Sequence, residues 1–89
     1  MTKVLYFTSA NCRPCKQFQP IVESVCEQLD IPMKVVKAEE EQGTFSRYGI
    51  SGVPSLIVIV DGIAKTQIVS TTTRYDLEKK IRNAMRKIS

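Results

Sequence analysis

Two cysteines separated by two residues are the part of this chain best suited to chemistry. The motif Cys12–Cys15 follows a strand-like run over residues 3–8 and precedes a helix-like stretch from residue 16 to about residue 29. At a helix N-terminus, the unpaired backbone N–H groups and the macrodipole favour an anion. The thiolate is such an anion and is the reactive form of cysteine. The spacing therefore predicts reversible thiol–disulfide chemistry, with Cys12 as the attacking thiol and Cys15 as the resolving thiol.

The residues beside the two thiols support this prediction. Arg13 places a positive charge next to Cys12, and a cation together with a helix end stabilises a thiolate by about 1–2 kcal/mol. A stabilised Cys12 thiolate is a better leaving group, which makes the disulfide more oxidising. Pro14 suits a first helical turn, and Asn11 is the expected N-cap. We expect Cys12 to be exposed and Cys15 to be more buried.

A metal site is the alternative interpretation of a Cys-x-x-Cys pair. Zinc needs four ligands, and the chain offers just one further cysteine, Cys26, and no histidine. The spacing of Cys26 places it on the apolar face of the predicted helix, so we expect a small buried hydrophobic residue and not a third redox centre. We therefore expect no metal and no cofactor beyond a redox-active Cys12–Cys15 disulfide.

Length and composition favour a single globular domain over residues 1–89, with 43% hydrophobic and 25% charged residues. No apolar run approaches the roughly 18 residues of a membrane-spanning helix. After Met1 the apolar run is too short for a signal peptide, which predicts a cytoplasmic protein. In that compartment a Cys-x-x-Cys pair is more often catalytic or metal-binding than structural.

The net charge of +4 raises the question of nucleic-acid binding. The basic residues form no dense run and no patch interleaved with aromatic residues, so a mildly basic surface is the better interpretation. The three glutamates at residues 39–41 are likewise read as a solvated acidic loop. We expect no nucleic-acid or membrane partner, and a monomer.

Hydrophobic periodicity and turn signals predict the order β-α-β-α-β-β-α. Pro20 would by itself break the first helix, Asp61-Gly62 predicts a hairpin, and Thr73 with Asp76 resembles a capping box. Right-handed crossovers then give an α/β fold with a four-stranded mixed sheet and helices on both faces. The expected strands are 3–8, 33–38, 55–60 and 63–70; the expected helices are 16–29, 44–48 and a last helix with the apolar stripe Leu77, Ile81, Ala84, Met85 and Ile88.

Taken together, these features resemble the thioredoxin family, in the family's order and over nearly the whole chain. The matching pieces are the 11–16 segment after a strand, Pro20 in the following helix, the segment 48–55 that ends in Val53-Pro54-Ser55, and the Asp61-Gly62 hairpin. The resemblance implies a thioredoxin-like fold, a cis Pro54 facing the dithiol, and one helix bent at Pro20. Because the first predicted strand leads directly into the dithiol motif, we expect a domain without the extra N-terminal strand and helix of typical thioredoxins. Its compact length is similar to that of glutaredoxins and of small archaeal or phage thioredoxins.

The same resemblance implies a protein-disulfide reductase that acts on disulfide-containing target proteins and is regenerated by thioredoxin reductase or another dithiol donor. It implies substrate contacts at Arg13, Pro14, Val53 and Pro54, and strand addition at Val53 is a common way to hold an extended peptide. Arg13 as simple surface charge and Pro54 as an ordinary loop proline remain the alternatives for those two residues.

Two other functions compete with this one. A glutaredoxin would use glutathione, but Pro14 before the second cysteine is the thioredoxin arrangement, and residues 70–73 stand where glutaredoxins carry a Gly-Gly turn. A non-catalytic binding subunit with the basic last helix as its docking face is the other alternative.

Several residues depart from the family pattern. Asn11 stands where tryptophan is usual, and Arg13 where glycine is usual. The buried aspartate that helps move protons to the resolving thiol corresponds to Tyr6, which cannot act as a carboxylate base, whereas Lys37 matches a lysine beside that aspartate. Tyr6 and Lys37 are therefore candidates for proton handling, with simple packing as the alternative.

Overall fold

The computed structural model describes residues 1–86 and has the predicted order of elements. The strands and helices are β1 (Thr2–Thr8), α1 (Arg13–Gln28), β2 (Met33–Lys37), α2 (Gln42–Arg47), β3 (Ser55–Val60), β4 (Ile63–Val69) and α3 (Arg74–Met85).

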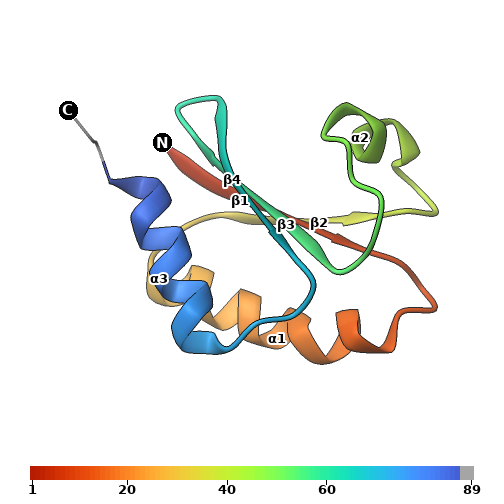
Figure 1. Cartoon of the computed structure of the whole chain (residues 1–89), viewed down its shortest axis with the longest axis horizontal. Helices are drawn as coiled ribbons and strands as arrows, with labels where there is room; N and C mark the ends of the chain where they lie inside the picture. The colour runs from red at the N-terminus through yellow and green to blue at the C-terminus, as the bar shows by residue number, and fades with distance from the viewer. Residues whose placement is uncertain (87–89) are drawn as a thin grey trace.

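One mixed sheet with strand order β2-β1-β3-β4 organises the chain (Figure 1). β1 lies parallel to β2 and antiparallel to β3, and the closing β3–β4 hairpin is antiparallel. The hairpin turn is at Asp61 and Gly62, which have φ values of 52° and 82°. Asp and Gly tolerate this left-handed conformation better than other residues, which explains the predicted turn.

Helices cover both faces of this sheet, as expected: α1 and α3 pack on one face and α2 lies over the other (Figure 1). Alternate residues of β1 point to opposite faces, so Val4 and Tyr6 join the α1/α3 side, whereas Leu5 and Phe7 join the α2 side. β1 therefore contributes to both halves of the core, and the loop that follows it starts from the buried C-terminal end of the strand.

Helix α1 runs without interruption through Pro20. Pro20 is exposed, so its ring lies on the solvent side and the opposite face remains available for packing. That buried face repeats at helical spacing and consists of Cys15, Phe18, Val22, Val25 and Cys26. Burial of this stripe against the sheet stabilises the helix despite the hydrogen bond that proline removes.

Some boundaries differ from the expected ones. α1 begins at Arg13, three residues before residue 16, because Pro14 fits its first turn. α2 begins earlier than the predicted 44–48 and ends before Gly49, whose φ is 65°. The capping interaction at α3 is confirmed, since the Asp76 N–H donates to Oγ1 of Thr73 over 3.1 Å. Ile88, predicted to complete the α3 stripe, lies outside the described residues.

Candidate functional site

The two cysteines of the motif are joined in a disulfide at the start of α1, with a Cα–Cα distance of 5.2 Å. Cys12 itself is the N-cap of α1, and its Sγ accepts a hydrogen bond from the Cys15 N–H over 3.1 Å. The prediction of Asn11 as N-cap is therefore wrong. Cys12 has the extended backbone of a cap residue and supplies the acceptor, so the helix terminus acts directly on its sulfur.

The two sulfurs differ in their access to solvent. Cys12 is 9% exposed and Cys15 is 0% exposed. The expectation that Cys12 is exposed is wrong for this disulfide form, because its sulfur is bonded to Cys15 and covered by the first turn of α1. The predicted order of exposure is nevertheless confirmed. An incoming thiol or disulfide therefore reaches Cys12 more readily than Cys15.

Tyr6 lies directly beneath the resolving cysteine. Its buried hydroxyl donates to the Cys15 carbonyl over 2.7 Å, and its ring centroid lies 6.1 Å from that of Phe18. Burial, and secondarily the charge of Glu23, raises the pKa of Tyr6 to about 12. The phenol is therefore protonated at neutral pH and links β1 to the first turn of α1.

Replacement of Tyr6 by phenylalanine should lower the free energy of unfolding of the oxidised protein by about 0.5–1.5 kcal/mol, because a buried hydrogen bond is lost. Since folding raises the phenol pKa from 10.0 to about 12, its contribution is complete below pH 10 and is lost as the pH rises toward 12. Urea unfolding at pH 7 and pH 11 measures both effects. Tyr75→Phe is the control, since Tyr75 is 74% exposed; an equal effect of both changes would contradict the role of the bond.

A second loop contributes the cis peptide bond between Val53 and Pro54, which the resemblance implies. Pro54 is buried and Val53 is half-buried. Among residues 1–86, the Val53 backbone forms no hydrogen bond, because the β3 ladder begins at Ser55. The N–H and C=O of Val53 are therefore available to a partner segment.

The sequence analysis did not single out Val69 and Ser70. The Ser70 N–H donates to the Pro54 carbonyl over 2.9 Å, and Ser70 has a φ of 71°. Val69 pairs with Ser55 and is 66% exposed. An exposed apolar side chain beside the cis proline adds to the surface for a partner. No local sequence pattern predicts this position of Val69, because it follows only from the register of the β3–β4 hairpin.

The remaining predicted residues lie on the surface. Arg13 and Pro14 are exposed in the first turn of α1, and in the described part of the chain Arg13 has no ion-pair partner. Lys37 is exposed at the end of β2 and lines a pocket together with Lys16 and Glu39. Lys37 therefore lies at the same end of the sheet as the β1–α1 loop, whose Ser9 and Ala10 line the same pocket. The surroundings of Lys37 and Tyr6 do not test their proton-handling role, which stays a prediction.

Cys26 is separate from this chemistry. It is 2% exposed within the α1 core face, and burial raises its pKa from 9.0 to about 11. The thiolate fraction at neutral pH is thereby reduced by about 100-fold.

In the reduced folded protein at pH 7.5, we expect iodoacetamide to modify Cys12 and leave Cys26 unmodified until urea unfolds the chain. Mass spectrometry of peptides checks this, and labelling of Cys26 as fast as Cys12 would contradict it.

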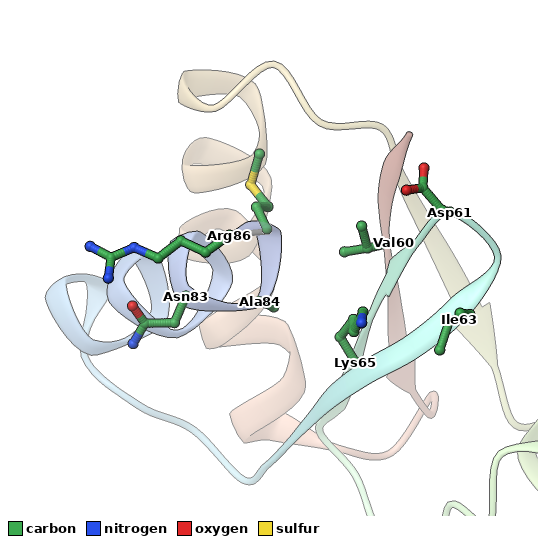
Figure 2. A pocket seen from close by; sticks show the side chains of 8 residues that line it. Val60, Asp61, Ile63, Lys65, Asn83, Ala84 and Arg86 are labelled. Carbon is green, nitrogen blue, oxygen red and sulfur yellow. The ribbon is translucent and has the colours of Figure 1, made fainter. Parts of the chain in front are cut away.

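A pocket of about 450 Å³ lies elsewhere, between the β3–β4 hairpin and the end of α3. Figure 2 shows Val60, Ile63 and Lys65 on its hairpin side and Asn83 and Ala84 on its α3 side. The hairpin turn is at the opposite end of the molecule from the β1–α1 loop (Figure 1). This pocket is therefore not part of the dithiol site.

Residues 1–86 hold no group of three or more His, Cys, Asp or Glu side chains arranged to bind a metal ion. In the same residues, no helix has the length and apolar character needed to cross a bilayer.

Known proteins share this arrangement. The family model described as Thioredoxin matches residues 1–83. The chain belongs to the thioredoxin family. A thioredoxin from Synechocystis sp. is 32% identical over 80 residues, which cover 78% of this chain and 75% of that protein. A thioredoxin from Bacillus subtilis is 28% identical over 83 residues, covering 91% and 76%. A structure of a mutant thioredoxin from Halobacterium salinarum superposes with a TM-score of 0.90 at 27% identity, covering 99% of this chain and 78% of that one.

Membership of the thioredoxin family, together with the Cys12–Cys15 disulfide, identifies the chain as a thiol–disulfide oxidoreductase that acts on protein disulfides. The matches are thioredoxins, so a glutaredoxin or a non-catalytic binding subunit is not favoured. Thioredoxins in general exchange electrons with a reductase and with disulfide-containing targets, and they need no added cofactor for this chemistry.

Proposed function

We propose that reduced Cys12 attacks a disulfide in a target protein and that Cys15 completes the reaction. The Cys12 thiolate forms a bond to one target sulfur, and the other target sulfur leaves as a thiolate that takes up a proton. The Cys15 thiolate then attacks the Cys12 sulfur and displaces the second target thiolate, which is protonated in turn. Two electrons pass to the target, and the protein is left with the Cys12–Cys15 disulfide.

The observation that carries this assignment is the unequal placement of the two sulfurs. Cys12 caps α1 and reaches solvent, whereas Cys15 is fully buried one turn along. Of the two cysteines, only Cys12 is accessible to a bulky target disulfide. The Cα atoms of Cys12 and Cys15 are 5.2 Å apart, which is within the range that lets Cys15 form a disulfide with Cys12.

A target segment is proposed to lie across the exposed first turn of α1 and the cis-proline loop, in contact with Arg13, Pro14, Val53 and Pro54. The Val53 backbone, unpaired within residues 1–86, supports this placement, because it can add an extended segment by main-chain hydrogen bonds. Arg13, the residue after Cys12, is exposed and has no ion pair among the described residues, and its positive charge is proposed to favour the Cys12 thiolate during turnover.

The remaining parts of the proposal concern the cellular cycle. The protein acts as a cytoplasmic monomer without metal or added cofactor, and thioredoxin reductase or another dithiol donor returns the disulfide to the dithiol. Lys37 and Tyr6 assist proton transfer near Cys15. Because the pKa of Tyr6 is raised to about 12, its phenol stays protonated at neutral pH and acts there as a hydrogen-bond donor, not as a base.

Insulin reduction coupled to NADPH oxidation tests this function. Turnover with thioredoxin reductase and little with glutathione plus glutathione reductase is the expected result. Turnover with glutathione alone would support the glutaredoxin alternative, and no turnover with either donor or with dithiothreitol would overturn the proposal. Titration of the dithiol against glutathione buffers then places its reduction potential among reductants or oxidants.

A further inference from the structure

A side chain extends the β1–β2 ladder into the active-site loop. The Ala38 N–H donates to the Thr8 carbonyl over 2.9 Å. The next bond of a parallel ladder would take the Ala10 N–H to the Ala38 carbonyl. The chain instead turns away after Lys37, and the Ala10 N–H donates to Oε2 of Glu39 over 2.5 Å. The carboxylate thus takes the place of a ladder carbonyl.

This bond is one of few that hold the loop between β1 and α1. Among the described residues, the one other hydrogen bond within residues 9–11 joins the Ser9 carbonyl to the Cys12 N–H, and it is long at 3.4 Å. The loop and the turn after β2 lie at the same end of the sheet (Figure 1). Loss of the Glu39 contact would therefore leave the residues before Cys12 attached mainly through their two ends.

We propose that Glu39 is a positioning residue of the dithiol site, which holds the loop in front of Cys12 through its bond to the Ala10 N–H. This inference rests on the proposed role of Cys12 as the attacking thiol. Glu39 touches neither sulfur in the described contacts; it acts through Ala10, and the effect on target reduction follows from the placement of Cys12.

The charges around Glu39 agree with this role. The Ala10 bond, and then the Glu39 backbone N–H and the charge of Lys37, lower the pKa of Glu39 from 4.5. Lys16, Lys37 and Glu40 line the same pocket. Because the pKa is lowered by folding, the bond is complete at neutral pH and is lost as the pH falls below about 4.5 through the folded pKa. At neutral pH the carboxylate is therefore charged and accepts strongly from Ala10.

An acid titration followed by NMR tests the bond itself. We expect the Ala10 amide proton shift of the oxidised protein to move with a midpoint below 4.5, the ordinary value for a glutamate. Glu39→Gln should abolish this titration. Glu40→Gln is the matched control, because Glu40 carries the same charge at the next position and has no bond to Ala10. An Ala10 amide that does not titrate in the unmodified protein would overturn the proposal.

The kinetic test compares Glu39→Ala, Glu39→Gln and Glu40→Ala in insulin reduction at pH 7. We expect Glu39→Ala to lower kcat/KM by about 3- to 10-fold, a fraction of the roughly 100-fold cost of misplacing a reacting group by 1 Å. Glu39→Gln keeps an acceptor oxygen and should recover part of the loss, while Glu40→Ala should remain unchanged. Urea unfolding of each variant separates loop placement from a loss of global stability.

The outcomes distinguish this inference from the proposed function. If the unmodified protein reduces insulin and Glu39→Ala matches Glu40→Ala, the positioning role is wrong and the dithiol function stands. If the unmodified protein has no activity, the proposed function fails first. The positioning role would also be overturned if Glu39→Gln lost as much kcat/KM as Glu39→Ala and both variants unfolded at the same lowered urea concentration.

Discussion

Replacement of Cys12 by serine should abolish the reduction of insulin disulfides. A serine hydroxyl does not ionise near neutral pH and forms no disulfide, so neither the attack nor the mixed intermediate is available. We expect a loss of at least about 1,000-fold, the scale on which removal of an enzyme's nucleophile acts. Insulin precipitation driven by dithiothreitol measures it, and full turnover by Cys12→Ser would refute the assigned roles.

The two other cysteines provide the matched comparisons for this experiment. Cys15→Ser keeps the attacking thiol but cannot resolve the intermediate, so mixed disulfides with target proteins should accumulate and be released by dithiothreitol. Cys26→Ala should retain activity, because Cys26 is buried in the α1 core and is not bonded to the pair. Non-reducing gels and intact mass separate these cases. Equal trapping by Cys12→Ser and Cys15→Ser would contradict the order of attack.

Replacement of Phe7 by alanine should have the largest effect on folding. Phe7 is fully buried between the sheet and α2, with its ring 5.0 Å from that of Phe45 and 6.1 Å from that of Tyr48. Truncation of a buried phenylalanine costs about 3–5 kcal/mol. The whole free energy of unfolding of a domain is roughly 5–15 kcal/mol. Urea unfolding should therefore show a transition shifted far toward low denaturant.

Two further substitutions keep this prediction testable if Phe7→Ala does not fold. Phe7→Leu retains most of the apolar volume and should cost less than the alanine change, about 1–2 kcal/mol. Tyr75→Ala removes an aromatic side chain that is 74% exposed and should lie within about 0.5 kcal/mol of the unmodified protein. Comparable losses for Phe7→Leu and Tyr75→Ala would contradict the role of burial.

Much of the architecture is predictable because its signals are local. The Leu56–Val60 run, the Asp61-Gly62 turn and the spacing of apolar residues along α1 each specify an element through neighbouring residues. The dithiol is predictable for the same reason, since both sulfurs lie within one turn of one helix. The continuation of α1 through Pro20 and the cis bond before Pro54 come from the family resemblance, because local preferences argue for a break and a trans bond.

The rest of the site depends on contacts between distant segments. The register of the β3–β4 hairpin pairs the exposed Val69 with Ser55, next to the cis proline, and brings the Ser70 N–H to the Pro54 carbonyl. The acidic loop at residues 39–41 is exposed at Glu39 and Glu40, as predicted, but two of its carboxylates also make contacts. Glu39 accepts from the Ala10 N–H, and Glu41 pairs with Lys34 over 3.3 Å. The bond between Glu39 and Ala10 requires the parallel alignment of β1 and β2, which no short stretch of sequence specifies.

Both outer strands of the sheet carry ammonium groups. β2 has Lys34 and Lys37, and β4 has the exposed Lys65. A strand of a second chain that paired with β2 or β4 would lie close to these charged side chains. Lysines on edge strands are a common way in which β proteins disfavour edge-to-edge aggregation. Part of the positive charge that raises the question of a nucleic-acid partner therefore lies on the two edge strands, where it disfavours pairing with a second chain.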